Sequence, residues 1–210
     1  MKQRAFQAAA IIAVLAAVFA VLYIAAGLWD DSTVMIDNKT YSTGDRSLTL
    51  VLLTEDGLED IGRFDRLESL DVMPYKVSAR LAVEADKYIS PEDAAKAMQQ
   101  IDELYGGCTD IADISFLAQS DLHDTLKSLD LSYCAVGDIS VLSEFTALET
   151  LDISHTNVTD LTPLLQLPSL RSVSFSGTGI DKSSLTAFED KGFECVYDDD
   201  TPFPVGIKRK

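Results

Sequence analysis

A 22-residue repeat constrains the fold of this chain more than any other feature of its sequence. Residues 126–147 align without a gap with residues 148–169, and a third unit begins at Leu170. The apolar residues of the first unit recur in the second: Leu126, Leu129, Leu131, Val136, Ile139, Leu142 and Phe145 fall on Leu148, Leu151, Ile153, Val158, Leu161, Leu164 and Leu167. The same spacing separates Leu48 from Leu70. A fixed period of this length indicates repeated units that stack on one another.

Each unit is expected to combine a short strand with a compact return. In the L-x-L piece, alternate side chains point inward and the residues between them point to the opposite face. The return has an apolar residue at every third position, which suits a 3₁₀ or extended segment better than an α-helix. One unit cannot bury its apolar side alone, so stacked units must share a continuous core.

The pattern resembles the leucine-rich repeat of bacterial internalin-type proteins. The segments LKSLDLSYCAVGDISVLSEF, LETLDISHTNVTDLTPLLQL and LRSVSFSGTGI carry the resemblance, over residues 126–180. It implies an α/β leucine-rich-repeat solenoid with short parallel strands and 3₁₀ or extended returns. It also implies that Cys134, Thr156 and Thr178 bond the backbone of the turns. Members of this family mostly bind proteins, so the resemblance implies a binding role and a protein partner.

The outward-facing strand residues are the predicted partner-binding face. Parallel strands lie about 4.8 Å apart, so equivalent residues of successive units should form columns. Two interpretations remain open for the columns: a row that binds cations or Lys and Arg side chains, and a solvated polar face. Tyr133 and His155 follow their strands at equivalent positions, and Tyr is enriched at interfaces. The complete predicted face is Asp71, Ser128, Asp130, Ser132, Tyr133, Thr150, Asp152, Ser154, His155, Ser172, Ser174 and Ser176.

Charge and motif content argue against several classes of function. The net charge is −17, which repels phosphate backbones and makes nucleic acid an unsuitable partner. The cysteines show no C-x-x-C spacing and there are only two histidines, so we predict no metal site and no cofactor. Cys134 and His155 could suggest a nucleophile and a base, but Cys134 sits at an inward turn position. No hydrolase or nucleotide-binding motif is present, so we predict no enzyme.

The N-terminus contains a long apolar stretch over residues 5–29. A helix of that length crosses a hydrocarbon layer of roughly 30 Å, and Lys2 and Arg4 predict a cytoplasmic N-terminus. We therefore expect a cytoplasmic stub and transmembrane signal-anchor helix at residues 1–30. The protein would then be a single-pass protein of the cell membrane with an extracytoplasmic repeat domain. A cleaved signal peptide, which would make the protein secreted, is the alternative.

The leucine-rich-repeat domain is expected to span residues 31–197, with a hairpin around Asn38 and Lys39 at its start. Residues 73–107 form an insertion, whose second half is a helix that begins after Ser90. The apolar stripe of this helix is expected to pack on the solenoid, and docking of a partner is the alternative. Residues 181–197 should form the C-terminal cap, in which Cys195 and Tyr197 continue the series of strands.

Residues 198–210 contain two prolines and end in Lys-Arg-Lys, and we expect them to be a flexible tail. Taken together, the sequence predicts an extracytoplasmic, membrane-tethered module that binds a protein through its repeat surface. Two alternatives stay open: a structural accessory subunit of a membrane complex, whose transmembrane helix makes specific contacts, and a secreted leucine-rich-repeat protein.

Overall fold

The computed structural model describes residues 33–86, 89–105, 110–119, 121–197 and 204–210. Residues Val34–Lys210 form one compact unit. Within the described residues, this unit contains a seven-stranded sheet with the strand order β3-β4-β5-β6-β7-β9-β8, and a separate two-stranded sheet, β1-β2. The larger sheet positions the candidate site.

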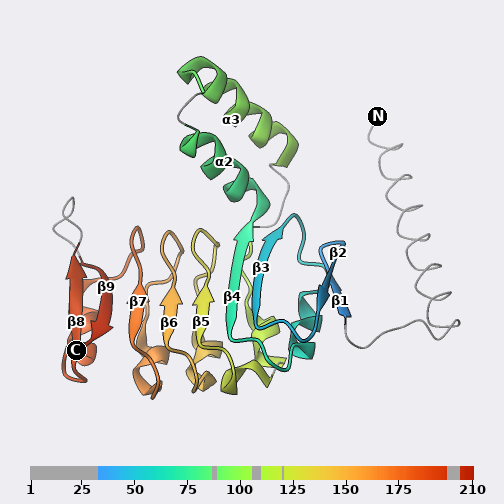
Figure 1. Ribbon diagram of the computed structural model, residues 1–210. Coiled ribbons are helices and arrows are strands. Elements are labelled where there is room, and N and C mark those ends of the chain that lie inside the picture. Colours follow the sequence, from blue (N-terminus) through green and yellow to red (C-terminus); the bar gives the residue numbers. More distant parts are fainter. Residues whose placement is uncertain (1–32, 87–88, 106–109, 120, 198–203) are drawn as a thin grey trace, which may run out of the picture. The chain divides into compact units, whose positions relative to one another are not determined.

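Five consecutive strands of the large sheet are parallel (Figure 1). Leu48 pairs with Leu70, then Leu70 with Leu129, Leu129 with Leu151 and Leu151 with Val173. The predicted register of the repeat is confirmed, including the 22-residue step from Leu48 to Leu70. These strands are β3 (Ser47–Leu52), β4 (Ser69–Pro74), β5 (Ser128–Asp130), β6 (Thr150–Asp152) and β7 (Ser172–Ser174).

The returns between strands are 3₁₀ helices, as the spacing of their apolar residues predicts. Their inward residues, among them Leu142 and Leu164, are almost fully buried and join the strand leucines in one core. The shared core explains why the units fold only as a stack. The 3₁₀ helices are η1 (Leu58–Arg63), η2 (Ser115–Gln119), η3 (Asp121–Asp124), η4 (Ser140–Glu144) and η5 (Thr162–Gln166).

An aspartate precedes three of these returns at the same position, two residues before the amide that it binds. The Oδ1 atom of Asp138 accepts a hydrogen bond of 2.8 Å from the amide of Ser140, and Asp160 binds the amide of Thr162 at 2.8 Å. Asp113 binds the amide of Ser115 in the same way, at 2.7 Å. Hydrogen bonds from these amides and from the hydroxyls of the same residues stabilise the ionised carboxylates and lower the pKa of Asp113 and Asp138; for Asp160 the Thr162 side chain is the larger cause and the Thr162 amide the second. The D-[IL]-[ST] element of the repeat is therefore a turn cap.

The N-terminal end of the array is covered by the predicted hairpin, formed by β1 (Thr33–Ile36) and β2 (Lys39–Ser42). Its turn residues are Asp37 and Asn38, with φ angles of 47° and 62°, so the turn lies one residue earlier than expected. The Asp37 carboxylate also accepts hydrogen bonds from the amides of Leu53 and Thr54, which fixes the hairpin to the end of β3.

The insertion forms two helices, α2 (Tyr75–Ala85) and α3 (Pro91–Tyr105). The expected start of α3 is confirmed, because the Ser90 hydroxyl accepts a hydrogen bond of 3.1 Å from the amide of Asp93. The expected packing of α3 on the solenoid is wrong: α3 lies along α2, which continues directly from β4 (Figure 1). Ion pairs from Lys76 and Arg80 to Asp102 join the two helices.

The C-terminal cap differs from the expectation in its strand order. After η6 (Lys182–Leu185) and α4 (Thr186–Glu189), β8 (Phe193–Tyr197) does not continue the parallel series. Instead β9 (Pro204–Arg209) lies between β7 and β8 and is antiparallel to both. The prediction of a flexible tail is therefore wrong for 204–209.

Two residues explain why β9 enters the sheet. Ile207 is 1% exposed and pairs with Val173, so it completes the core at the end of the array. Gly206 allows close approach, because a Cβ atom there would lie 2.6 Å from the carbonyl oxygen of Val173.

Two predictions from the sequence, the transmembrane helix and the membrane localisation, are corrected here. No helix in the described parts of the chain is long and apolar enough to cross a membrane. The longest of them, α3, has 15 residues and would span about 22 Å at 1.5 Å per residue, and it carries Glu92, Asp93 and Lys96. The transmembrane helix of the predicted fold class and the membrane localisation are contradicted on this finding. The segment 5–29, on which both rested, lies outside the described residues.

Candidate functional site

The structure brings the predicted strand-face residues together in two columns. Asp71, Asp130, Asp152 and Ser174 are in register on β4, β5, β6 and β7. In the second column, the Thr150 hydroxyl donates a hydrogen bond of 2.9 Å to the Ser128 hydroxyl. The second column consists of four residues that pair in this order: Ser69, Ser128, Thr150 and Ser172.

Two carboxylates of the first column also support the turns that follow their strands. Asp130 accepts a hydrogen bond of 2.8 Å from the amide of Ser132, and Asp152 accepts one of 2.8 Å from the amide of Ser154. Ser132 is only 8% exposed, so this member of the predicted face contributes little contact surface. Asp130 and Asp152 are half-buried, and their carboxylates are held in fixed positions.

Asp71 has a different environment although it is in register with Asp130. Its strand continues through Met73 into α2, so no turn amide faces the carboxylate. The Oδ1 atom of Asp71 is buried without a hydrogen-bond partner. Burial, and then the nearby Asp130 carboxylate, raise the pKa of Asp71.

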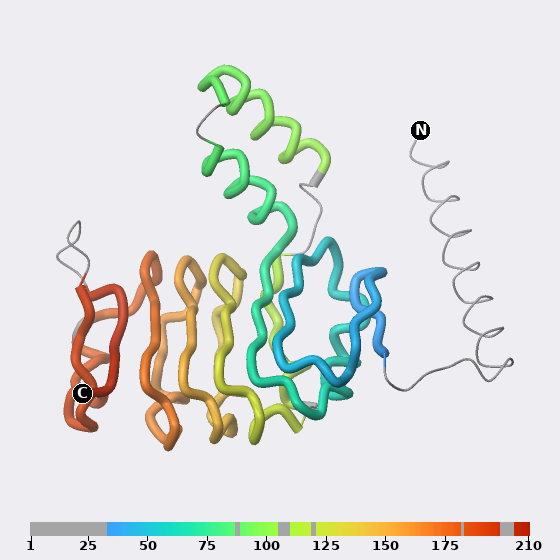
Figure 2. Tube along the Cα trace, viewed as in Figure 1, coloured from blue at the N-terminus to red at the C-terminus, as the bar shows by residue number. Residues whose placement is uncertain are grey.

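Tyr133 and His155 form a stacked pair at the edge of the strand face. Their ring centroids are 4.5 Å apart and the ring planes differ by 16°. The amide of Tyr133 donates to the carbonyl of Ser154 at 2.9 Å, and the amide of His155 to that of Ser176 at 2.7 Å, so the parallel ladder continues to this edge. Figure 2 shows the turns after β5, β6 and β7 in a row along this edge.

The backbone at these two positions is unusual for residues with side chains. Tyr133 and His155 have φ angles of 64° and 58°, and Gly177 occupies the same position of the next repeat with a φ of 70°. The His155 ring fills the space beside Gly177, where a Cβ atom would lie 2.4 Å from Nδ1 of His155. We call Tyr133, His155 and Gly177 the aromatic edge.

Cys134 does not have the properties of a catalytic nucleophile. Its Sγ atom donates a hydrogen bond of 3.2 Å to the carbonyl of Val72. Burial, and then the Asp130 and Asp71 carboxylates, raise the pKa of the Cys134 thiol to about 12, so the reactive thiolate is not formed near neutral pH. Thr156 and Thr178 donate to the carbonyls of Ile153 and Phe175 at 2.6 and 2.7 Å, which confirms the implied turn-bonding role at these two positions, whereas Cys134 bonds a carbonyl of strand β4.

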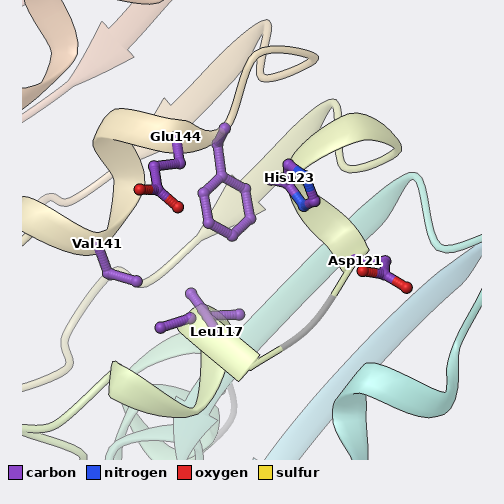
Figure 3. Close-up of a pocket in the computed structure, with 7 residues that line it drawn as sticks. Leu117, Asp121, His123, Val141 and Glu144 are labelled. Atoms are coloured by element: carbon purple, nitrogen blue, oxygen red, sulfur yellow. The ribbon is translucent and has the colours of Figure 1, made fainter.

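A cavity of about 200 Å³ lies on the return side of the array, between η2 and η4 (Figure 3). Leu117 and Val141 line it, and Glu144 and His123 lie across from each other. His123 also approaches the carboxylate of Asp124 at 3.4 Å. Within the described residues, no group of three or more His, Cys, Asp or Glu side chains could hold a metal ion. The cavity contains no residue of the predicted partner-binding face.

One family model matches part of the repeat region. Residues 124–166 match the family model "Leucine Rich repeats (2 copies)". The chain contains leucine-rich repeats. The matched segment includes β5, η4, β6 and η5, and therefore both Asp130 and Asp152 and the stacked Tyr133 and His155.

Two solved structures of internalins from Listeria monocytogenes are similar to the chain. Internalin C2 is 16% identical over 74% of this chain and 63% of its own, with a TM-score of 0.41. A second internalin is 17% identical over 72% of this chain and 55% of its own, with a TM-score of 0.30. The chain thus spans less than two thirds of the length of either. A search of curated proteins gives no match.

The sequence analysis did not predict a second row of residues, which lies where the parallel strands begin, at the ends of the strands opposite to the aromatic edge. The residue before each parallel strand is charged, and the sign alternates from one strand to the next. The row is Arg46, Glu68, Lys127, Glu149 and Arg171, which we call the edge ladder. The 22-residue spacing of Lys127, Glu149 and Arg171 is a signal that could have revealed it.

Proposed function

We propose that this chain is a protein-binding module and that its partner contacts the strand face and the aromatic edge. The observation that carries the proposal is the stacking of Tyr133 on His155 at positive φ angles. A left-handed conformation costs a residue with a side chain on the order of 1 kcal/mol, and such strain concentrates at functional positions. Gly177, at the equivalent position, shows that the repeat does not require a side chain there.

The aromatic edge has the chemistry of an interface centre. Tyr133 is 36% exposed and His155 is exposed, so the stacked rings present a rigid apolar surface with polar atoms at its rim. Tyr side chains are enriched among the residues that contribute most to binding, because they supply contact area with few rotatable bonds. Turn residues held by a rigid scaffold are common binding positions.

The neighbouring carboxylates determine the charge that the partner should present. Asp71, Asp130 and Asp152 lie side by side, and no basic side chain in the described part of the chain forms an ion pair with them. An Arg side chain suits both parts of the surface, because its guanidinium stacks on aromatic rings and binds carboxylates with paired hydrogen bonds. We propose a partner segment that presents Arg or Lys.

A matched pair of variants tests the proposal. The Tyr133→Ala/His155→Ala protein removes the stack, and the Glu144→Ala/Gln166→Ala control removes two exposed side chains from the return side. Partner recovery from extracts of the producing cells should fall by at least about tenfold for the first variant, the loss expected for one interface centre. The control should retain the wild-type level. Equal recovery by both variants would overturn the proposal.

A further inference from the structure

Within the edge ladder, acidic and basic side chains of neighbouring strands form ion pairs. Glu68 forms ion pairs with Arg46 on one neighbouring strand and Lys127 on the other, and the Lys127 Nζ atom lies 2.8 Å from Oε2 of Glu68. Glu149 pairs with the Nε atom of Arg171, also at 2.8 Å. These pairs lie at the edge of the sheet where the parallel strands begin, opposite to the aromatic edge.

The alternation ends where β9 enters the sheet. Because β9 is antiparallel to β7, Ser172 pairs with Lys208 and Arg209 comes to lie beside Arg171. The amide of Arg209 donates a hydrogen bond of 2.6 Å to the carbonyl of Arg171, so the two arginines are direct neighbours. Like charges on adjacent strands repel each other. In a chain with a net charge of −17, this is a local concentration of positive charge.

The two arginines line an open cavity of about 520 Å³. The other lining residues are Glu149, Pro168, Ser169 and Lys210. Of the lining residues, Glu149 is the one acidic side chain, and it already faces Arg171. The cavity therefore carries an excess of positive charge.

The guanidinium groups of Arg171 and Arg209 have nitrogen atoms that can donate hydrogen bonds to a ligand. Arg171 uses its Nε atom for Glu149, which leaves its terminal nitrogens for another acceptor. The Arg209 guanidinium lies 5.1 Å from the centre of the Phe193 ring, which fixes its position. In the described part of the chain, Arg209 has no carboxylate partner, and its one acceptor is the carbonyl of Pro168 at 3.5 Å.

We propose that Arg171 and Arg209 bind a phosphate group in this cavity. A phosphate group carries a charge of about −1.5 to −2 at pH 7 and offers three oxygens, so it can accept from two guanidinium groups and from the Ser169 hydroxyl at once. A carboxylate offers two oxygens in one plane, which matches a single guanidinium. The site is independent of the proposed protein-binding surface, because none of its residues belongs to the strand face or the aromatic edge.

The test is a titration of the full chain with inorganic phosphate at constant ionic strength, followed by NMR of the arginine Nε–Hε and backbone amide signals. The signals of Arg171, Arg209 and Ser169 should shift in a saturable manner. Arg171→Gln and Arg209→Gln should each weaken binding by at least about tenfold, the loss expected for a charge-assisted hydrogen bond. Arg46→Gln is the matched control, since it removes a positive charge from the same edge outside the cavity, and it should bind as the wild type does.

Three results would overturn the phosphate site: no saturable shift, an equal response to acetate at the same concentration, or equal weakening by Arg46→Gln. The amide signal of Ile207 monitors the folding of β9 in each variant. If the Arg209→Gln protein loses that signal, Arg209→Lys keeps the charge but not the planar fork, and it should still weaken binding severalfold relative to Arg46→Gln.

Discussion

The rings of Tyr133 and His155 stack with their centroids 4.5 Å apart, although both residues hold a backbone conformation that favours glycine. The next repeat has Gly177 at this position and leaves the space beside it to the His155 ring. Three successive units thus use one backbone geometry for a tyrosine, a histidine and a glycine. The side chains at the first two positions are not needed to form the turn, which is the basis for assigning them to binding.

The first prediction concerns the strain at His155. His155→Gly should be more stable than His155→Ala by about 1 kcal/mol, because both lose the stack but only alanine keeps a Cβ atom at positive φ. For a domain of this size that is a difference in Tm of about 2–4 °C. Calorimetry of the two variants provides the measurement. A His155→Ala protein that is more stable than His155→Gly, the order that is normal in regular strands and helices, would contradict backbone strain at His155.

The second prediction concerns Gly177. Gly177→Ala places a Cβ atom against the His155 ring, which must swing away and leave Tyr133. The ring-current shift of the His155 imidazole protons in the NMR spectrum should then disappear. Gly192→Ala is the matched control, since Gly192 also has a positive φ, of 85°, but has no atom within 4 Å of the added Cβ. It should carry a similar backbone cost and leave the imidazole signals unchanged. Loss of the shift in both variants would show that backbone strain alone disturbs the stack.

The third prediction concerns the insertion of β9. Gly206→Ala should destabilise the protein by about 1–3 kcal/mol, because the added carbon would lie 2.6 Å from a backbone oxygen of β7 that cannot rotate away. Limited proteolysis should cleave the variant within residues 204–210 faster than the wild type. Gly137→Ala, whose added carbon meets Asn157 at an ordinary 3.8 Å, should behave like the wild type. Equal protection of Gly206→Ala would mean that β7 and β9 are not so closely packed.

The fourth prediction concerns the pH dependence of stability at Asp71. Its pKa is raised in the folded state, so between the unfolded value of about 3.9 and the folded value the native protein binds more protons. The contribution of Asp71 to stability therefore falls as the pH rises through this window. Asp71→Asn removes the charge, and its Tm at pH 7 should exceed that of the wild type. The difference should vanish below about pH 4. A difference that is independent of pH would assign the effect to packing instead.

The sequence predicted the repetitive part of the fold because one physical rule applies to every unit. The spacing of Leu129 and Leu151 defines both the strand and its register, and the polar residues between the leucines must then form columns. The positions of Asp130 and Asp152 followed directly from this rule. Their hydrogen bonds to the turn amides did not, since those depend on where each strand ends.

The non-repetitive parts were harder to predict because their partners lie far away in the sequence. Helix α3 has a clear start at Ser90, but its packing surface is α2, which has no buried residue to mark it as a helix. Strand β9 contains Gly206 and begins with a proline, features that are typical of a loop. Its pairing with β7 and β8 explains it, and the position of Arg209 beside Arg171 depends on the pairing with β7.

The central claim is that the strand face with Tyr133 and His155 contacts a protein, and site-specific photocrosslinking tests it most directly. A photoreactive phenylalanine derivative would replace Tyr133 in one protein and the exposed Glu144 of the return side in another, each irradiated in the producing cells. The account predicts one protein adduct from position 133, strongly reduced by Asp130→Asn/Asp152→Asn in the same chain, and none from position 144. The same adduct pattern from both positions, or no adduct from position 133, would contradict it.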